Sequence, residues 1–140
     1  MAIPPYPGEP EEYMQGYFGL DLEYLRGPLA IFAEAHAGVW DTPLIDEELE
    51  VASAFLEIRY DVAPQWYLAG RVDGMGFGEI DAGPADGGVQ PWDDDVFRTE
   101  FAIGYRLTRE VLLKADWQHT TTGENGWTQN LFAAQLSTVF

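Results

Sequence analysis

Charged side chains recur at every second position in four stretches of the chain, and their spacing points most directly to a function. Side chains two positions apart lie on the same face of a β-strand. Bases facing acids across a water-filled passage sort solutes by charge, and the same groups paired with each other stabilise a wall; both roles stay open. We call this set the charged ladder and expect it to line a passage: Glu57, Arg59, Arg71, Asp73, Arg98, Glu100, Arg106, Lys114 and Asp116.

Three other motifs are weaker. Residues 74–78 are rich in glycine but lack the following helix of a nucleotide-binding loop, so we interpret them as a bend or bulge. Residues 93–95 are three aspartates without the glycine and glutamate spacing of a calcium loop, and we interpret them as solvated. A histidine–carboxylate pair such as His36 and Glu34 can serve in catalysis, but no serine or aspartate stands at a suitable spacing. We therefore expect no enzyme activity, no cofactor and no metal.

Composition excludes several classes of protein. The 140 residues suit one domain, and 24 acids against 7 bases give a net charge of -17, which argues against nucleic-acid binding. Cysteine is absent, which excludes disulfides, zinc–thiolate sites and thiol catalysis. No apolar run is long enough for a transmembrane helix.

The elements that carry the ladder are predicted to be strands. In the stretch 97–107, Phe97 and Ile103 fall on one side of an alternating pattern, whereas Arg98 and Arg106 fall on the other. Such alternation is typical of a strand with one apolar and one wet face. We predict strands, within a few residues at each end, at about 15–25, 28–40, 49–62, 65–78, 96–107, 111–121 and 129–140.

Short and long connections alternate between these strands. Tight turns are predicted at 25–28, 63–64 and 108–110. Longer connections are predicted at 41–48 and 79–95, which are acidic, and at 123–126, where Asn125-Gly126 favours a type I′ turn. The alternation indicates an up-and-down antiparallel meander over 15–140, preceded by an irregular, proline-rich leader over 1–14.

Each predicted strand has an apolar face without charge. On four of the strands the opposite, polar face carries the charged ladder. A soluble lipocalin-like barrel turns its apolar face inward, and a membrane barrel turns it outward. The mixing of acids with bases on the polar face suits a lumen. Aromatic residues toward both ends of the apolar face, with small residues between them, also favour the membrane. They are Tyr24, Tyr60, Trp66, Tyr105 and Phe140 beside the tight turns and Phe18, Phe97, Trp117 and Phe132 toward the long loops.

The polar face holds five of the seven bases, on neighbouring strands. Neighbouring strands lie about 4.8 Å apart, which permits one continuous basic strip with acids beside it. Eight acids lie on the same face, and the long loops are acidic. This balance predicts a mild preference for cations.

Residues 130–140 resemble the closing strand of bacterial outer-membrane β-barrels. In that family the barrel assembly machinery reads a terminal phenylalanine and the apolar residues at alternate positions before it. Phe132, Leu136 and Phe140 match this pattern, whereas Thr138 departs from the usual apolar residue.

Two turns strengthen the resemblance. Residues 60–68 and 105–115 resemble periplasmic hairpins of porins, and the resemblance extends over about 15–140. It implies short turns on the periplasmic side, acidic loops outside, and contact with outer-membrane lipid, lipopolysaccharide and the barrel assembly machinery.

We therefore expect an all-β, antiparallel, up-and-down transmembrane β-barrel that lets small hydrophilic solutes diffuse through the outer membrane. A homo-oligomer is compatible with this expectation, and nucleic acid is not a partner. Because seven strands is an odd number and single-chain bacterial barrels use even numbers, we expect the C-terminal part of a barrel of roughly 14 to 18 strands. The alternatives are an eight-strand barrel with one strand unrecognised, a soluble lipocalin-like binding barrel, and a structural or enzymatic outer-membrane barrel.

Overall fold

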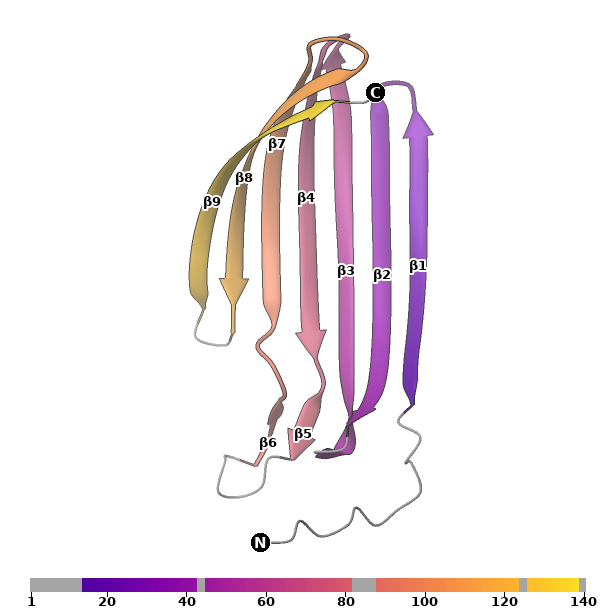
Figure 1. The fold of residues 1–140 in the computed structure, drawn as a ribbon, viewed down its shortest axis with the longest axis vertical. Coiled ribbons are helices and arrows are strands. Elements are labelled where there is room, and N and C mark those ends of the chain that lie inside the picture. The colour runs from indigo at the N-terminus through magenta and orange to yellow at the C-terminus, as the bar shows by residue number, and fades with distance from the viewer. Residues whose placement is uncertain (1–13, 43–44, 82–87, 124–125, 139–140) are drawn as a thin grey trace, which may run out of the picture.

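The protein is a single large antiparallel sheet with a small hairpin attached (Figure 1). The computed structural model describes residues 14–42, 45–81, 88–123 and 126–138. No helix suited to crossing a membrane occurs in this part of the chain. The large sheet has the order β1-β2-β3-β4-β7-β8-β9. Its strands are β1 (Gln15–Arg26), β2 (Leu29–Thr42), β3 (Ile45–Ala63), β4 (Trp66–Phe77), β7 (Val96–Arg106), β8 (Val111–Thr122) and β9 (Trp127–Thr138).

The predicted meander is confirmed. All seven predicted strands are present, and each pairs antiparallel with the next of the seven along the chain. The tight turns lie at one end of the sheet, which we call the turn end, and the other connections lie at the loop end (Figure 1). At the first tight turn, Gly27 adopts a φ of 57°, a left-handed conformation that glycine adopts without strain.

Two predicted connections are wrong. The acidic stretch 41–48 is mostly strand, because β2 continues to Thr42 and β3 begins at Ile45, with which Thr42 pairs across a register shift. The stretch 79–95 contains the hairpin of β5 (Glu79–Asp81) and β6 (Val89–Pro91). Both stretches carry acids that break the apolar alternation, so sequence periodicity did not reveal them as strands. The predicted leader lies outside the described residues except for Met14, and so do residues 124–125 of the 123–126 turn.

The register gives the sheet two chemically distinct faces. One cross-strand row, for example, joins Leu22, Ala33, Leu56 and Val72, and the adjacent row on the other face joins Glu57 with its neighbours on β2 and β4. The uncharged face on β3 runs from Ala52 at the loop end to the turn end. The predicted separation of charge between the two faces is therefore present along the sheet.

The polar face is the more buried of the two. From Val51 to Tyr60, odd-numbered side chains of β3 are half-buried and even-numbered ones are exposed. On the apolar face Leu56 is 41% exposed and Ile103 is 43% exposed. All the buried apolar side chains lie on the polar face; they are Ala30, Leu49, Tyr67 and Ala102.

This burial pattern follows from curvature. The ribbon bends strongly at β8 and β9 (Figure 1), and side chains on the inner side of a curved sheet converge, whereas those on the outer side spread apart. The crowding of the polar side chains marks the polar face as the inner one. A soluble sheet of this kind places its apolar face inside; here the order is reversed.

The two edges of the sheet are β1 and β9. Within the described residues each pairs with only one neighbour, and the side chains of β1 are exposed along its whole length. Because six antiparallel pairings separate them, β1 and β9 run in the same direction. They therefore cannot pair antiparallel with each other.

Candidate functional site

The structure brings the whole charged ladder onto the inner face of four adjacent strands. Glu57 and Arg59 come from β3, and the pair at 71 and 73 comes from β4. Three members come from β7, and the pair at 114 and 116 comes from β8. Cross-strand register places all nine on the face opposite Leu56 and Ile103.

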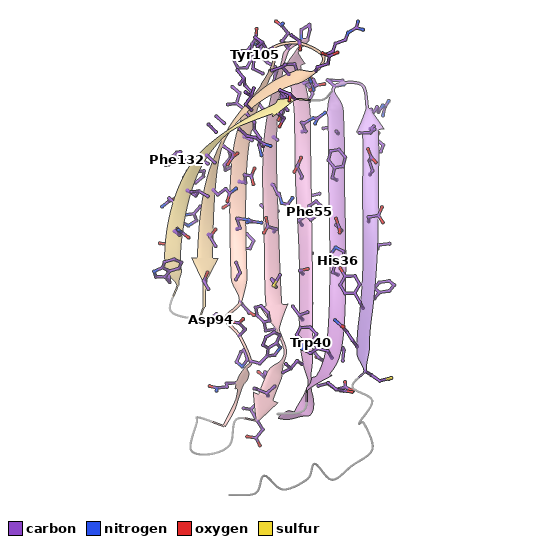
Figure 2. The ribbon with its side chains drawn as sticks, in the orientation of Figure 1. His36, Trp40, Phe55, Asp94, Tyr105 and Phe132 are labelled. Atoms are coloured by element: carbon purple, nitrogen blue, oxygen red, sulfur yellow. The ribbon has the colours of Figure 1, made fainter. Side chains whose placement is uncertain are left out.

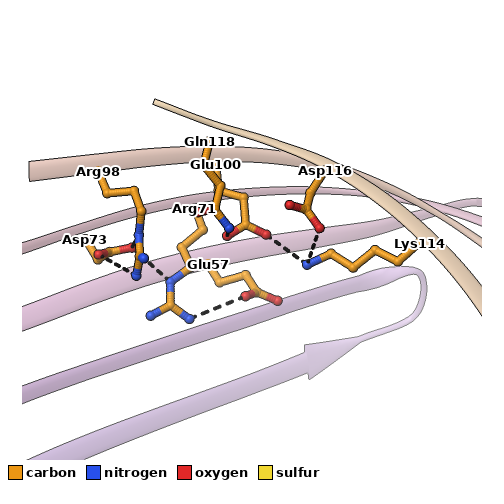
Figure 3. Close-up of polar contacts among 8 residues, drawn as sticks. All are labelled: Glu57, Arg71, Asp73, Arg98, Glu100, Lys114, Asp116 and Gln118. Atoms are coloured by element: carbon orange, nitrogen blue, oxygen red, sulfur yellow. Dashed lines mark hydrogen bonds and ion pairs between the residues drawn. The ribbon is translucent and has the colours of Figure 1, made fainter. Parts of the chain in front are cut away.

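Asp73 is the centre of the first group of ion pairs. One carboxylate oxygen accepts hydrogen bonds from the Nε atoms of Arg71 and Arg98, each at 3.1 Å, and the other lies 3.0 Å from Nη2 of Arg98 (Figure 3). Arg71 also lies 4.0 Å from Glu57 and stacks over the ring of Phe55. The Asp73 side chain is only 17% exposed, so its carboxylate is stabilised mainly by these two guanidinium groups and little by water.

Lys114 is the centre of the second group. Its ammonium lies 2.8 Å from Glu100 and 3.5 Å from Asp116, and Gln118 donates to the other oxygen of Glu100 at 3.3 Å (Figure 3). One oxygen of Asp116 is buried and has no hydrogen-bond partner among the described residues. A buried carboxylate oxygen normally finds a partner, so this site is suited to an ordered water.

The ladder is a mosaic of alternating charges rather than a continuous basic strip. Arg71 stands between Glu57 and Glu100 in one cross-strand row, and Asp73 stands beside Arg98 in the next. The bases therefore do not form the continuous strip that the strand spacing permits, whereas Glu57, Asp73 and Glu100 are their partners, as predicted. The cause is that the acids also alternate along each strand, so the register places an acid beside most of the bases.

A third group lies near the turn end around the ring of Tyr67. Arg106 is paired with Asp61 at 2.8 Å, which joins β7 to β3 across β4. The guanidinium groups of Arg59 and Arg106 lie 5.0 and 5.4 Å from the Tyr67 ring centroid. Tyr67 pairs in register with Gly104, and both are buried. Its ring therefore lies over the glycine and supports both cations.

We predict that Gly104→Ala destabilises the protein by about 1 to 2 kcal/mol, because the added Cβ overlaps the Tyr67 ring. Gly70→Ala is the matched control on the apolar face, where the nearest side-chain atom, from Phe101, is 3.8 Å away. Urea unfolding of both variants in lipid vesicles measures the difference. Equal stability of the two variants would contradict the packing of Tyr67 on Gly104.

His36 takes part in a hydrogen-bond chain rather than in a nucleophilic arrangement. Its Nδ1 bonds to the Tyr17 hydroxyl and its Nε2 to Glu34. Ser53 lies directly opposite His36 in the register, but both ring nitrogens are already engaged. Sequence reasoning missed Tyr17 and Ser53; the tight turn at Gly27, which fixes the β1–β2 register, was the signal that could have found Tyr17.

A second feature that sequence reasoning missed is an aromatic cluster at the loop end. Trp92, which follows β6, packs edge-on against Trp40 and Phe77 at centroid distances of 5.4 and 4.7 Å, and its indole donates to the Glu50 carbonyl. In the predicted solvated run 93–95, Asp95 accepts from the backbone N–H of Phe77 at 3.1 Å. Among the described residues no group of three acidic or histidine side chains is arranged to hold a metal ion.

The aromatic residues of the apolar face follow the prediction at the turn end and, at the loop end, for Phe18 and Phe97, which lie near the starts of β1 and β7. Trp66 and Tyr105 contact each other at the turn end, with ring centroids 4.6 Å apart. Figure 2 shows Tyr105 at this end of the sheet. Trp117 and Phe132 pair with each other in the middle of their strands, so their predicted place at the loop end is wrong. The alternation predicted the face on which they lie but not their position between the loop end and the turn end, because neighbouring strands are staggered.

Of the three residues predicted to be read during assembly, two are described. Phe132 and Leu136 lie on the apolar face of β9, 78% and 64% exposed. Figure 2 shows Phe132 standing out from the edge strand. Phe140 lies outside the described residues.

No protein-family model matches the chain, and neither a curated protein nor a solved structure matches it.

Proposed function

We propose that this chain forms part of the wall of a porin-like β-barrel in a bacterial outer membrane, through which small hydrophilic solutes diffuse. The observation that carries the proposal is the reversed burial of the sheet. The uncharged face is the exposed one, and the charged face is crowded and partly buried. A face of exposed leucine, isoleucine and aromatic side chains is costly in water and favourable in lipid.

Strand length supports the same function. On β3 the uncharged stretch of the outer face runs from Ala52 to Val62, and Glu50 is the first charge beyond it. About 9 to 11 tilted residues cross the apolar core of a bilayer. The outer faces of β4 and β7 are likewise free of charge along their length. The apolar band is therefore as tall as a membrane requires.

The burial pattern argues against the soluble lipocalin-like alternative. Such a barrel holds its ligand against inward apolar side chains, whereas the inner face here carries ion pairs around Asp73 and Lys114. The hydrogen-bonded His36 leaves no free ring nitrogen, which gives the enzymatic alternative no specific support.

The inner face sets the selectivity that we expect. It carries eight acids and five bases, so a passage along it favours cations mildly. Arg71 and Arg98 hold positive charge near the middle of the face and oppose this preference. Outer-membrane lipid and lipopolysaccharide are the partners of the apolar face, and the barrel assembly machinery inserts the protein.

Ion selectivity tests the proposal. The full protein is reconstituted in planar bilayers, and its reversal potential is measured in a salt gradient. Replacing Arg71 and Arg98 with glutamine is expected to shift the reversal potential toward stronger cation selectivity. The shift is expected to shrink at molar salt, where the Debye length falls to about 3 Å.

Arg109→Gln is the matched control, because Arg109 lies in the exposed β7–β8 turn and away from the inner face. It is expected to leave the reversal potential unchanged. Absence of conductance from a correctly inserted protein would overturn the channel function. If the protein conducts but its ion preference does not change when Arg71 and Arg98 are replaced, the charged ladder does not select ions and only stabilises the wall.

A further inference from the structure

The two acids of β1 on the polar face stand apart from the charged ladder. Asp21 lies directly opposite Glu34 in the register, and Glu23 follows on the same face. No basic side chain of the described residues lies within ion-pair distance of Asp21 or Glu23. Acids that face each other across a strand pair destabilise it. The N-terminal edge of the sheet therefore carries an uncompensated negative charge.

On β3, β4, β7 and β8, by contrast, the acids of the polar face have basic partners. Every acid that the sheet places on the polar face from Glu57 of β3 to Asp116 of β8 lies within 4.0 Å of an arginine or lysine. The paired acids are Glu57, Asp61, Asp73, Glu100 and Asp116. The polar face thus pairs its acids with arginine or lysine on β3, β4, β7 and β8, from Glu57 onward. On β2 Glu34 is paired with His36 alone, and at the β1 edge Asp21 and Glu23 have no basic partner among the described residues.

The bases of the chain do not compensate Asp21 and Glu23 in the described structure. Five of its seven bases belong to the polar face of β3, β4, β7 and β8, and Arg26 and Arg109 lie in or beside turns. Residues 1–13 contain no lysine or arginine. Arg59 has no ion pair among the described residues, but its guanidinium lies over the Tyr67 ring of β4, on the side of β3 away from β1. The groups that compensate Asp21 and Glu23 are therefore expected outside these 140 residues.

The backbone of β1 is also unsatisfied on its outer side. β1 spans Gln15–Arg26 and pairs only with β2 among the described strands. An unpaired edge of this length is a template for another strand. The other edge differs, because the polar-face residues of β9 carry no charge; they are Gln129, Leu131, Ala133, Gln135 and Ser137.

A second copy of this chain does not fit the β1 edge. Pairing β1 with β1 of another copy would bring acids against acids, and β9 of a copy in the same orientation would run parallel to β1 and offer no base. We propose that β1 pairs with an antiparallel strand from outside this sequence whose inner face carries lysine or arginine opposite Asp21 and Glu23. The inference rests on the proposed function, since it treats the sheet as part of a larger wall.

Disulfide trapping tests the partner chemistry. The chain has no cysteine, so Leu22→Cys creates a unique thiol on the apolar face between the two acids. The full protein in detergent micelles is equilibrated in a glutathione buffer with strand peptides of the length of β1. Each peptide has a cysteine opposite position 22 and either lysine or glutamate on both sides of it.

The lysine peptide is expected to be trapped with an equilibrium constant about tenfold above that of the glutamate peptide, as two favourable cross-strand pairs replace two repulsive ones. In the Leu22→Cys, Asp21→Asn, Glu23→Gln variant this preference is expected to disappear. Phe132→Cys on β9 is the control at the uncharged edge and is expected to show no preference.

Three results would overturn the inference: equal trapping of the two peptides, a lysine preference that persists without Asp21 and Glu23, or a disulfide-linked dimer of two chains that outcompetes both peptides. The outcome is separable from that of the proposed function. A protein that conducts in bilayers but shows no lysine preference would overturn this inference alone. A lysine preference in a protein that does not insert into lipid would overturn the proposed function alone.

Discussion

Replacing Leu56 or Ile103 with arginine is expected to destabilise the protein in lipid by roughly 2–4 kcal/mol, if the residue lies near the bilayer midplane. Both side chains lie on the exposed, uncharged face, on β3 and β7. The cost arises because a guanidinium group there must leave water for hydrocarbon. Unfolding in urea from phospholipid vesicles measures the change.

Gln118→Arg is the matched control on the inner face. Gln118 lies beside Glu100 on β8, so an arginine there has a carboxylate partner and a polar surface. A much smaller penalty is expected than for Leu56→Arg. Ala102 is unsuitable as a control because it is only 7% exposed, and a large side chain would clash there whatever its charge. Equal penalties on both faces would contradict the assignment of the apolar face to lipid.

The variant Asp73→Asn is expected to lower the free energy of unfolding by about 1.5 to 3 kcal/mol. Asp73 accepts hydrogen bonds from both Arg71 and Arg98, and its side chain is 17% exposed. An amide of the same shape leaves two guanidinium groups close together without a carboxylate between them. Chemical unfolding in vesicles, compared with the unchanged protein, measures the loss.

Asp21→Asn provides the comparison within the same cross-strand row. Asp21 is exposed and lies opposite Glu34, so removing its charge relieves a repulsion and breaks no ion pair. Its effect is expected within about 0.5 kcal/mol of zero. A loss at Asp21 as large as that at Asp73 would mean that the ion pairs around Asp73 contribute little to stability.

Alternation in the sequence was sufficient to predict the strands and their faces. A period of two needs only neighbouring residues, so the stretch 97–107 revealed which side chains share a face without any knowledge of the fold. The tight turn at Gly27 fixed the order of β1 and β2 in the same local way. Where acids interrupted the pattern, at Asp46 in β3 and in the β5–β6 hairpin, the prediction of a loop was wrong.

The contacts of the candidate site depended on register. Whether a base stands beside another base or beside an acid depends on how two strands are staggered, and alternation within one strand does not contain that information. For this reason the sequence predicted the members of the charged ladder, but not that they form an alternating mosaic around Arg71 in place of a continuous basic strip. The support of Arg59 by Tyr67 over Gly104 was unpredictable for the same reason.

By itself, the sequence determined an antiparallel sheet with one charged and one uncharged face, because these properties follow from local periodicity and turn length. Only the tertiary structure decided which face is the inner one. Curvature is a property of the whole sheet, arising from twist and stagger accumulated over seven strands. It places Asp73 and Lys114 on the crowded inner face and leaves Leu56 on the outer one, an arrangement that no single strand specifies.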